Sequence, residues 1–136
     1  WSGTGNTAAM AEMIAKGVTE AGADPVIIPF ENITPDSLAD DPAYALGCPS
    51  MGAEQLEESV VDPFVEELLG TVSGKKILLF GSYGWGDGEW MRNWTEQMTG
   101  AGAEMIEPEG VICNEAPDSE AEAALNAAGR ALAAAI

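Results

Sequence analysis

A run near the start of the chain alternates hydroxyl and amide side chains with glycines: Ser2, Gly3, Thr4, Gly5, Asn6 and Thr7. A segment with helical periodicity follows at once, so the run leads into a helix N-terminus, where unpaired N–H groups and the helix dipole favour an anion. The run holds no Lys or Arg. It therefore fits neither a nucleotide-hydrolysing P-loop, which needs a lysine, nor the GxGxxG dinucleotide pattern. The residues predict a neutral cradle for a terminal phosphate, with a purely structural helix cap as the alternative.

Two further loops combine glycines with an exposed-looking apolar residue. The second loop contains Pro49, Ser50, Met51, Gly52, Ala53 and Glu54, and the third contains Ser82, Tyr83, Gly84, Trp85 and Gly86. Trp85 is poorly placed among glycines for a core and could stack on a planar ligand. Met51 could provide a polarizable cover for the ligand's opposite face. The alternative is that both side chains only cap the core.

The amino-acid composition of the chain excludes several kinds of active site. The chain has no histidine, which excludes Ser-His-Asp and Cys-His catalysis and any Cys/His zinc centre. The 2 cysteines, Cys48 and Cys113, form no CxxC pair, and each follows an apolar run. We expect both to be free thiols, buried or half-buried.

The net charge of the chain limits the kinds of molecule that it can bind. Asp and Glu number 23 against 5 Lys and Arg, for a formal net charge of −18. Such a surface repels nucleic acid and anionic lipid and attracts basic proteins. No apolar run approaches the roughly 20 residues that span a bilayer. We expect a cytoplasmic protein that binds neither nucleic acid nor membrane.

The elements that would position the three loops alternate along the chain. Apolar runs predict strands at residues 25–30, 43–47, 76–81 and 110–113. Helical spacing predicts helices at residues 7–21, 59–69 and 89–100 and from residue 119 onward. This alternation predicts an α/β fold, a parallel sheet with helices on both faces, with ligands at the carboxyl ends of the strands. At 136 residues we expect a single domain, 1–136.

The start of the chain does not fit this pattern. A doubly wound domain should have a strand feeding the first loop, yet the sequence opens at Trp1 in that loop. We expect that the first strand is absent from this sequence, and that the sequence as it stands folds poorly or binds its ligand weakly.

Three stretches together resemble the three FMN loops of short-chain flavodoxins, especially those of anaerobic bacteria such as clostridia. These stretches are residues 1–7, 51–54 and 81–86. The resemblance implies a flavodoxin-like doubly wound sheet of strand order 2-1-3-4-5, here without its first strand. It also implies a low-potential one-electron carrier, not an enzyme, whose non-covalent FMN cycles between semiquinone and hydroquinone. Its partners would be redox proteins with basic faces, such as ferredoxin-type reductases or oxidoreductases, met transiently by a monomer.

The same resemblance assigns roles within the loops. The phosphate would be held by the first loop and Ser82. Trp85 would cover the outer flavin face and Met51 the inner one, while the Glu54 carboxylate would accept the flavin N3–H. The backbone of Gly84 would reach the pyrimidine side, and Gly52 would be the peptide that reorients on reduction. Two positions depart from relatives: Ala53, where Asp is frequent, and Pro49, where some have a hydroxyl residue.

Acidic residues near the site could lower the second reduction potential. Glu54, Asp87 and Glu115 are the candidates, although Asp87 and Glu115 could be ordinary solvated loop acids. Alternative functions are the FMN domain of a larger reductase and an FMN-dependent enzyme of the quinone-reductase type. A phospho-receiver domain is disfavoured because its acidic pocket is missing where the 43–47 strand ends.

Overall fold

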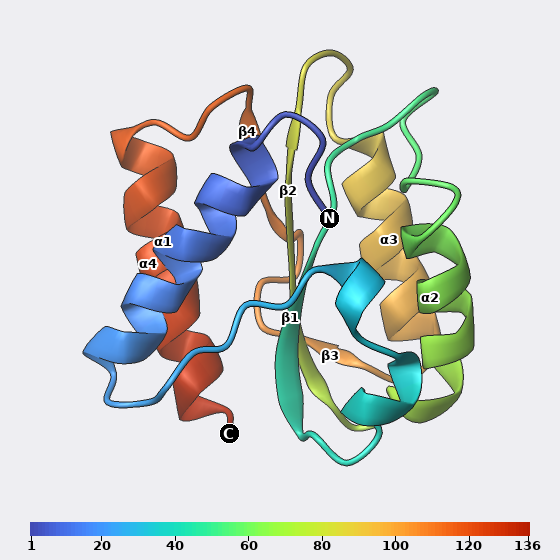
Figure 1. Ribbon diagram of the computed structural model, residues 1–136, viewed down its shortest axis with the longest axis vertical. Coiled ribbons are helices and arrows are strands. Elements are labelled where there is room, and N and C mark those ends of the chain that lie inside the picture. The colour runs from blue at the N-terminus through green and yellow to red at the C-terminus, as the bar shows by residue number, and fades with distance from the viewer.

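The computed structural model describes residues 1–136 as a three-layer α/β arrangement (Figure 1). Helices α1 (Asn6–Glu20) and α4 (Ser119–Ala134) cover one face of the sheet. Helices α2 (Val61–Leu68) and α3 (Glu89–Gly100) cover the other. Short 3₁₀ turns lie at Phe30–Asn32, Pro35–Leu38 and Leu69–Thr71. The predicted α/β class is confirmed.

The sheet is parallel and is organised around one long strand. Strand β2 (Lys76–Tyr83) pairs with β1 (Ala43–Gly47) on one side. On its other side it pairs with β3 (Glu104–Met105) along its first residues and with β4 (Val111–Asn114) along its last. In the expected order, β1 takes the third place, β2 takes the fourth, and β3 and β4 share the fifth.

Strand β2 is apolar on both faces because a helix layer packs against each. Ile77 and Leu79 point into the cluster formed with α2 and α3. Leu78 and Phe80 point into the cluster formed with α1 and α4. A strand buried on both faces reads as a continuous apolar run, which is why the sequence predicted it clearly.

The predicted helices are confirmed, and α3 has the predicted bounds. In α2, Pro63 occupies the first turn, where its missing N–H breaks no helical hydrogen bond. Strand β3 was not predicted, since two residues carry no periodicity.

The predicted strand at residues 25–30 is wrong. Residues 25–29 are irregular, and Val26, Ile27 and Ile28 are 79%, 49% and 45% exposed. Pro25 and Pro29 carry no N–H, and no strand lies beside this segment, because β1 pairs with β2 alone. An extended apolar sequence becomes a strand only where a neighbour completes its hydrogen bonds.

Helices α1 and α4 pack at unusually short range through two glycines. A methyl group on Gly17 would overlap the backbone of Asn126, and one on Gly129 would overlap the backbone of Ile14. The two helices therefore touch backbone to backbone in the second half of α1, where Ile14 and Gly17 meet residues 126–129 of α4.

Both cysteines are free, as predicted. Cys48 is fully buried and Cys113 half-buried. Burial raises the pKa of the Cys48 thiol to about 11, although a hydrogen bond from the Glu57 N–H opposes the rise.

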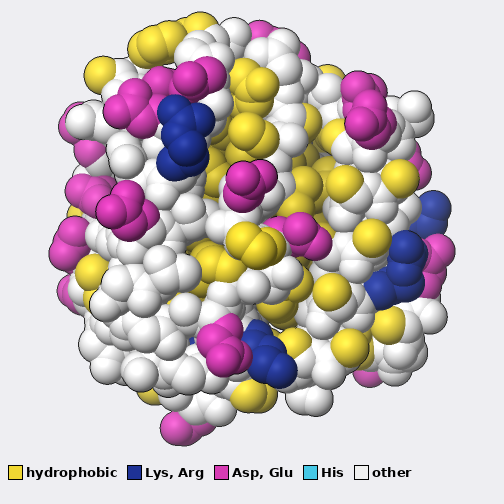
Figure 2. All heavy atoms as spheres, turned by 180° about the vertical axis from the view of Figure 1, so that it is seen from behind, with side chains coloured by type: hydrophobic (Ala, Val, Ile, Leu, Met, Phe, Trp, Pro, Cys, Tyr) yellow, Lys and Arg dark blue, Asp and Glu magenta, His cyan; other side chains and the backbone are white.

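The surface is strongly acidic. On the face seen in Figure 2, Asp and Glu are spread widely, basic side chains stand at a few places, and hydrophobic side chains gather along the middle. Two ion pairs are present, Arg92–Asp87 and Arg130–Glu20. None of the helices is both long and apolar enough to cross a membrane.

Candidate functional site

The three predicted loops meet at the carboxyl ends of β1 and β2. The Trp1 nitrogen donates to the Gly47 carbonyl over 2.8 Å, which seats the first loop at the end of β1. The Ser50 N–H donates to the Ser82 carbonyl over 2.9 Å, so the second and third loops continue side by side beyond the strands. All the predicted cofactor-binding residues therefore lie at one end of the molecule.

The first loop presents free donors at the N-terminus of α1. The Ser2 hydroxyl accepts from the N–H groups of Gly5 (3.1 Å) and Ala8 (3.3 Å), so it folds the loop back over the helix end. Gly5 precedes the helix with a φ of 96°, a conformation that favours glycine. The N–H groups of Asn6 and Thr7 have no acceptor, as the first turn of a helix requires. This geometry suits an anion that accepts several N–H groups.

A buried hydroxyl pair joins the first loop to the third. The Thr7 and Ser82 hydroxyl oxygens are 3.1 Å apart, and the Ser82 N–H donates to the Thr7 oxygen over 3.4 Å. Both residues are buried. The pair fixes the N-terminus of α1 against the end of β2.

The second loop is a tight turn closed at both ends. Met51 and Gln55 exchange two backbone hydrogen bonds of 2.8 Å. Between them Gly52 has a φ of 52° and Glu54 a φ of 54°. A methyl group at Gly52 would meet only the Gln55 side chain, at 3.9 Å, so the turn stands open to solvent.

The Glu54 carboxylate connects this turn to the third loop. Its Oε1 accepts from the N–H groups of Asp87 (3.3 Å), Gly88 (3.3 Å) and Glu89 (3.2 Å), which form the N-terminus of α3. Gly86, with a φ of 85°, passes so close to this carboxylate that a side chain there would overlap it. Glu54 thus acts as a clamp between two loops, and its Oε2 makes no hydrogen bond to the protein.

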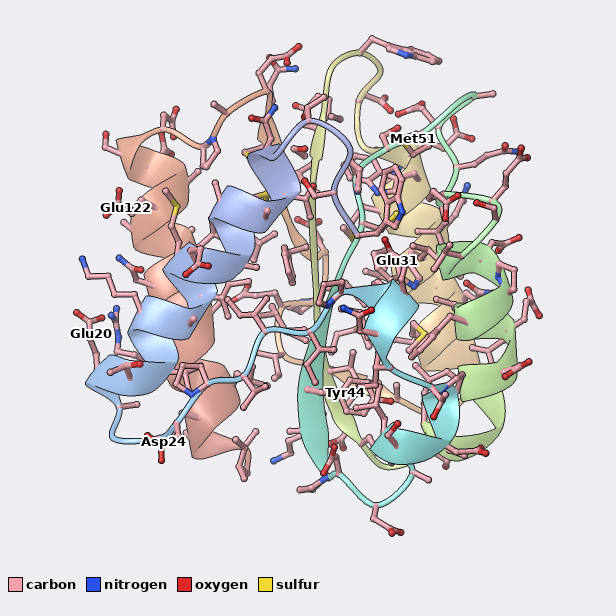
Figure 3. All side chains as sticks on the ribbon, in the orientation of Figure 1. Glu20, Asp24, Glu31, Tyr44, Met51 and Glu122 are labelled. Atoms are coloured by element: carbon pink, nitrogen blue, oxygen red, sulfur yellow. The ribbon has the colours of Figure 1, made fainter.

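Two large apolar side chains stand exposed beside this clamp. Trp85 is 63% exposed and Met51 is 36% exposed. Figure 3 shows Met51 on the segment that follows β1, toward the upper end of the view. Below them Trp90 is buried, and its Nε1 donates to the Cys48 carbonyl over 3.1 Å, which holds the second loop onto α3.

The acidic residues proposed near the site have different surroundings. Asp87 is exposed and pairs with Arg92 at 2.8 Å, and this guanidinium lowers the pKa of Asp87. Glu115 follows β4, with its N–H donating to the Tyr83 carbonyl over 2.8 Å. A methyl group on Gly84 would lie 3.3 Å from the Glu115 carboxylate, which borders the third loop. Glu115 takes part in neither ion pair, whereas Arg92 offsets the charge of Asp87.

Sequence reasoning missed Glu57, whose carboxylate holds the turn between the second loop and α2. Its carboxylate accepts from the Val60 N–H (2.7 Å), the Val61 N–H (3.1 Å) and both the N–H and the hydroxyl of Ser59. Burial would raise the pKa of Glu57, but these hydrogen bonds lower it to about 2. A signal existed, because Glu57 lies just before an apolar helix, as a capping acid does.

The predicted residues differ in how the protein uses them. Thr7, Ser82 and Glu54 hold the loops together through their side chains. Four others lie exposed on the loop surfaces: Gly3, Thr4, Ala53 and Gly84. Pro49 and Ser50 are half-buried where β1 leads into the second loop. The arrangement offers helix N–H donors and hydroxyls for an anion, next to exposed apolar side chains for a planar group.

Comparison with known proteins gives a consistent result. The sequence model of the family described as Flavodoxin matches residues 1–127. The chain is 49% identical over 120 residues to a flavodoxin of Clostridium beijerinckii, covering 88% of this chain and 87% of that protein. It is 49% identical over 122 residues to a flavodoxin of Megasphaera elsdenii, covering 90% and 88% respectively. The solution structure of two-electron reduced Megasphaera elsdenii flavodoxin superposes with a TM-score of 0.91 at 47% identity, covering 99% of this chain and 96% of that one.

Proposed function

This chain belongs to the flavodoxin family, whose members bind FMN and carry electrons, and on that premise we propose that its three loops hold FMN for transfer of single electrons between redox proteins. The observation that carries the proposal is the convergence of an unpaired helix N-terminus with exposed Trp85 and Met51. A single domain, residues 1–136, would perform this role.

The donor set fits the phosphate of FMN. The N–H groups of Asn6 and Thr7 are free, and the hydroxyls of Ser2, Thr4, Thr7 and Ser82 lie in or beside the same loop. A phosphate dianion held without Lys or Arg requires this density of donors together with the positive end of a helix dipole.

The exposed apolar side chains fit the flavin ring. Trp85 and Met51 would cover its two faces, since aromatic stacking and thioether contacts both favour a flat, polarizable surface. FMN supplies one- and two-electron redox chemistry when bound. The protein would exclude water from the ring and would favour one-electron over two-electron transfer.

The turn at Gly52 would favour transfer of one electron at a time. Its ends are fixed by the Met51–Gln55 hydrogen bonds, while Gly52 itself is open, so the peptide can turn without moving the rest of the loop. In the reduced protein the Gly52 carbonyl would accept the N5–H of the flavin. Glycine permits the positive φ that such a turn needs.

The local charges would oppose the second electron. Glu54 and Glu115 border the site, and the phosphate has no lysine beside it in the first loop. Like charges at close range disfavour a further negative charge on the ring, so the second potential falls. Glu54 Oε2, which the clamp leaves free, would accept the flavin N3–H.

The partners would be proteins with basic faces. A net charge of −18 speeds encounters with positive surfaces and acts more on the rate of association than on affinity, as suits a carrier that meets its partners transiently. Ferredoxin-type reductases and oxidoreductases are of this kind.

The test is a stepwise reduction of the FMN-loaded protein with dithionite, followed by visible absorbance. We expect a broad long-wavelength band to rise and then fall, which is the sign of separate one-electron steps. Direct bleaching would overturn the one-electron proposal, and failure to retain FMN would overturn the assignment of the site.

A glycine pair makes the test specific to the turn. Gly52→Val cannot easily keep a φ of 52°, whereas Gly70→Val places its side chain in open space at an ordinary φ. We expect the long-wavelength band to shrink severalfold in Gly52→Val and to persist in Gly70→Val. Equal bands in the two variants would remove Gly52 from the mechanism.

A further inference from the structure

The third loop ends in an aspartate–glycine pair just before α3, at the upper end of the molecule in Figure 1. Asp87 is the one aspartate of the chain that precedes a glycine, and no asparagine precedes one. The backbone nitrogen of Gly88 can approach the Asp87 side chain closely, because glycine has no side chain to obstruct it and adopts many backbone conformations. Three other aspartates precede proline, whose nitrogen carries no hydrogen: Asp24, Asp41 and Asp62.

Such a pair can rearrange without any added reactant except water. The Gly88 nitrogen bonds to Cγ of Asp87, and the nitrogen's proton and one carboxyl oxygen leave as water, which closes a succinimide ring. Water then opens the ring at one of its two carbonyl groups. One opening restores aspartate, and the other gives isoaspartate, in which the main chain runs through the former side chain and is one methylene longer.

The Asp87 carboxylate is exposed, but Arg92 restrains it. The Asp87 side chain is 78% exposed. Arg92 Nη2 donates to Asp87 Oδ1 over 2.8 Å, and Arg92 Nη1 donates to the Asp87 carbonyl oxygen over 3.0 Å. One guanidinium thus holds the carboxylate beside its own carbonyl oxygen. Because that oxygen and the Gly88 nitrogen point in different directions from the same carbon, this bridge keeps Cγ away from the nitrogen.

Arg92 also acts on the reactivity of the carboxyl group. Its guanidinium lowers the pKa of Asp87 through a hydrogen bond and its positive charge. An ionised carboxylate gives up an oxygen less readily than a protonated carboxyl group does. The ion pair therefore opposes ring closure by its charge as well as by its geometry.

The attacking nitrogen is restrained by Glu54. The Gly88 N–H donates to Glu54 Oε1 over 3.3 Å. The same oxygen accepts from the N–H groups of Asp87 and Glu89. The Gly88 carbonyl accepts from the Met91 N–H over 3.0 Å, so Gly88 is also held at the first turn of α3. Turning the peptide group to bring its nitrogen onto Cγ would break these hydrogen bonds.

We propose that Asp87 is a site of isoaspartate formation, and that the Arg92 bridge and the Glu54 clamp keep the reaction slow in the folded protein. The two restraints come from different elements, α3 and the second loop. Loss of order in either element therefore releases the pair. The longer main chain of the product would separate the N–H groups that Glu54 holds together.

The experiment compares the unmodified protein with Arg92→Met, incubated side by side for weeks in mildly acidic solution. Arg92→Met keeps an unbranched stem and removes the guanidinium. Arg130→Met is the matched control, because it removes the same charge from the other exposed ion pair. Isoaspartate is measured with a protease that cuts before aspartate but not before isoaspartate. The cuts before Asp36 and Asp118, which both precede serine, are internal references.

We expect the cut before Asp87 to be lost severalfold faster in Arg92→Met than in Arg130→Met, which should behave as the unmodified protein. Equal rates in the two variants would overturn the role of Arg92. In urea the contacts are gone, so all three proteins should convert Asp87 at one rate, faster than the folded unmodified protein does. No conversion in urea, or equal rates in the folded and unfolded protein, would overturn the proposal.

Glu54→Gln tests the second restraint, with Glu58→Gln as its control because Glu58 is exposed. We expect severalfold faster conversion in Glu54→Gln alone. Slower conversion would mean that the carboxylate takes up the Gly88 proton as a base, and its part in the proposal would be wrong.

The reaction at Asp87 can be measured without FMN, but its effect on FMN rests on the proposed function. Protein that has accumulated isoaspartate should retain FMN severalfold less well than freshly prepared protein. Isoaspartate with unchanged FMN retention would remove the third loop from the proposed FMN site and leave the reaction itself standing. Weak FMN retention before any isoaspartate forms would count against the proposed function alone.

Discussion

The hydroxyl groups of Thr7 and Ser82, 75 residues apart in sequence, meet inside the protein at 3.1 Å. One comes from the first turn of α1 and the other from β2, so this contact ties the helix N-terminus to the centre of the sheet. Its geometry leaves each oxygen with hydrogen-bonding capacity for a ligand at the helix end.

Replacing Thr7 by Val keeps the side-chain shape but leaves the Ser82 hydroxyl buried without this partner. We expect a loss of about 1–3 kcal/mol in the free energy of unfolding, measured by urea denaturation. The double variant Thr7→Val/Ser82→Ala should lose less than the sum of the single variants, since it leaves no orphaned hydroxyl. We also expect FMN binding to weaken by roughly tenfold or more. Riboflavin, which has no phosphate, serves as the control, and an equal loss with riboflavin would contradict a role at the phosphate.

Replacing Glu54 by Gln removes the charge that holds the N-terminus of α3. We expect the amides of Asp87, Gly88 and Glu89 to exchange several times faster, with a loss of about 1 kcal/mol in stability. Glu58→Gln is the matched control, because Glu58 is exposed. Unchanged exchange at α3 would show that the clamp contributes nothing to the order of the third loop.

Trp85 and Trp94 should behave in opposite ways when replaced by Ala. Trp85 is exposed, so Trp85→Ala should change stability by less than about 0.5 kcal/mol while weakening FMN binding roughly tenfold. Trp94 is buried, and Trp94→Ala should cost about 3–5 kcal/mol. Urea denaturation without FMN and fluorescence titration with FMN separate the two effects. A Trp85→Ala protein that binds FMN normally would exclude stacking.

Glu57 should make stability depend on pH in acid solution. Its pKa falls from an ordinary 4.5 to about 2 on folding, so its stabilisation is complete above about pH 4.5 and disappears as pH falls towards 2. We expect Glu57→Gln to cost about 1–3 kcal/mol at pH 7, and the gap from the unmodified protein to narrow below pH 4.5. Urea denaturation at several pH values measures this gap. A gap that widens in acid would contradict the hydrogen-bonded carboxylate.

Sequence reasoning succeeded where local pattern and packing agree. Strand β2 is buried on both faces and α3 has one apolar face, so both could be located from periodicity. The segment at residues 25–29 has the same apolar character as a strand, but pairing depends on a neighbour that no local pattern reveals. The loops could be placed at one end of the sheet, yet the Glu54 clamp could not be predicted. It depends on a positive φ and on amides more than 30 residues away.

The contact between Gly17 and Gly129 has a consequence for the other end of α1. The proposed phosphate donors, the N–H groups of Asn6 and Thr7, lie about 16 Å along the helix from Gly17 at 1.5 Å per residue. The two helices contact each other through backbone atoms. A methyl group added at Gly17 or Gly129 would therefore push them apart and change the tilt of α1. The direction in which the N-terminus of α1 presents its free N–H groups therefore depends on α4, a helix that contributes no residue to the proposed site.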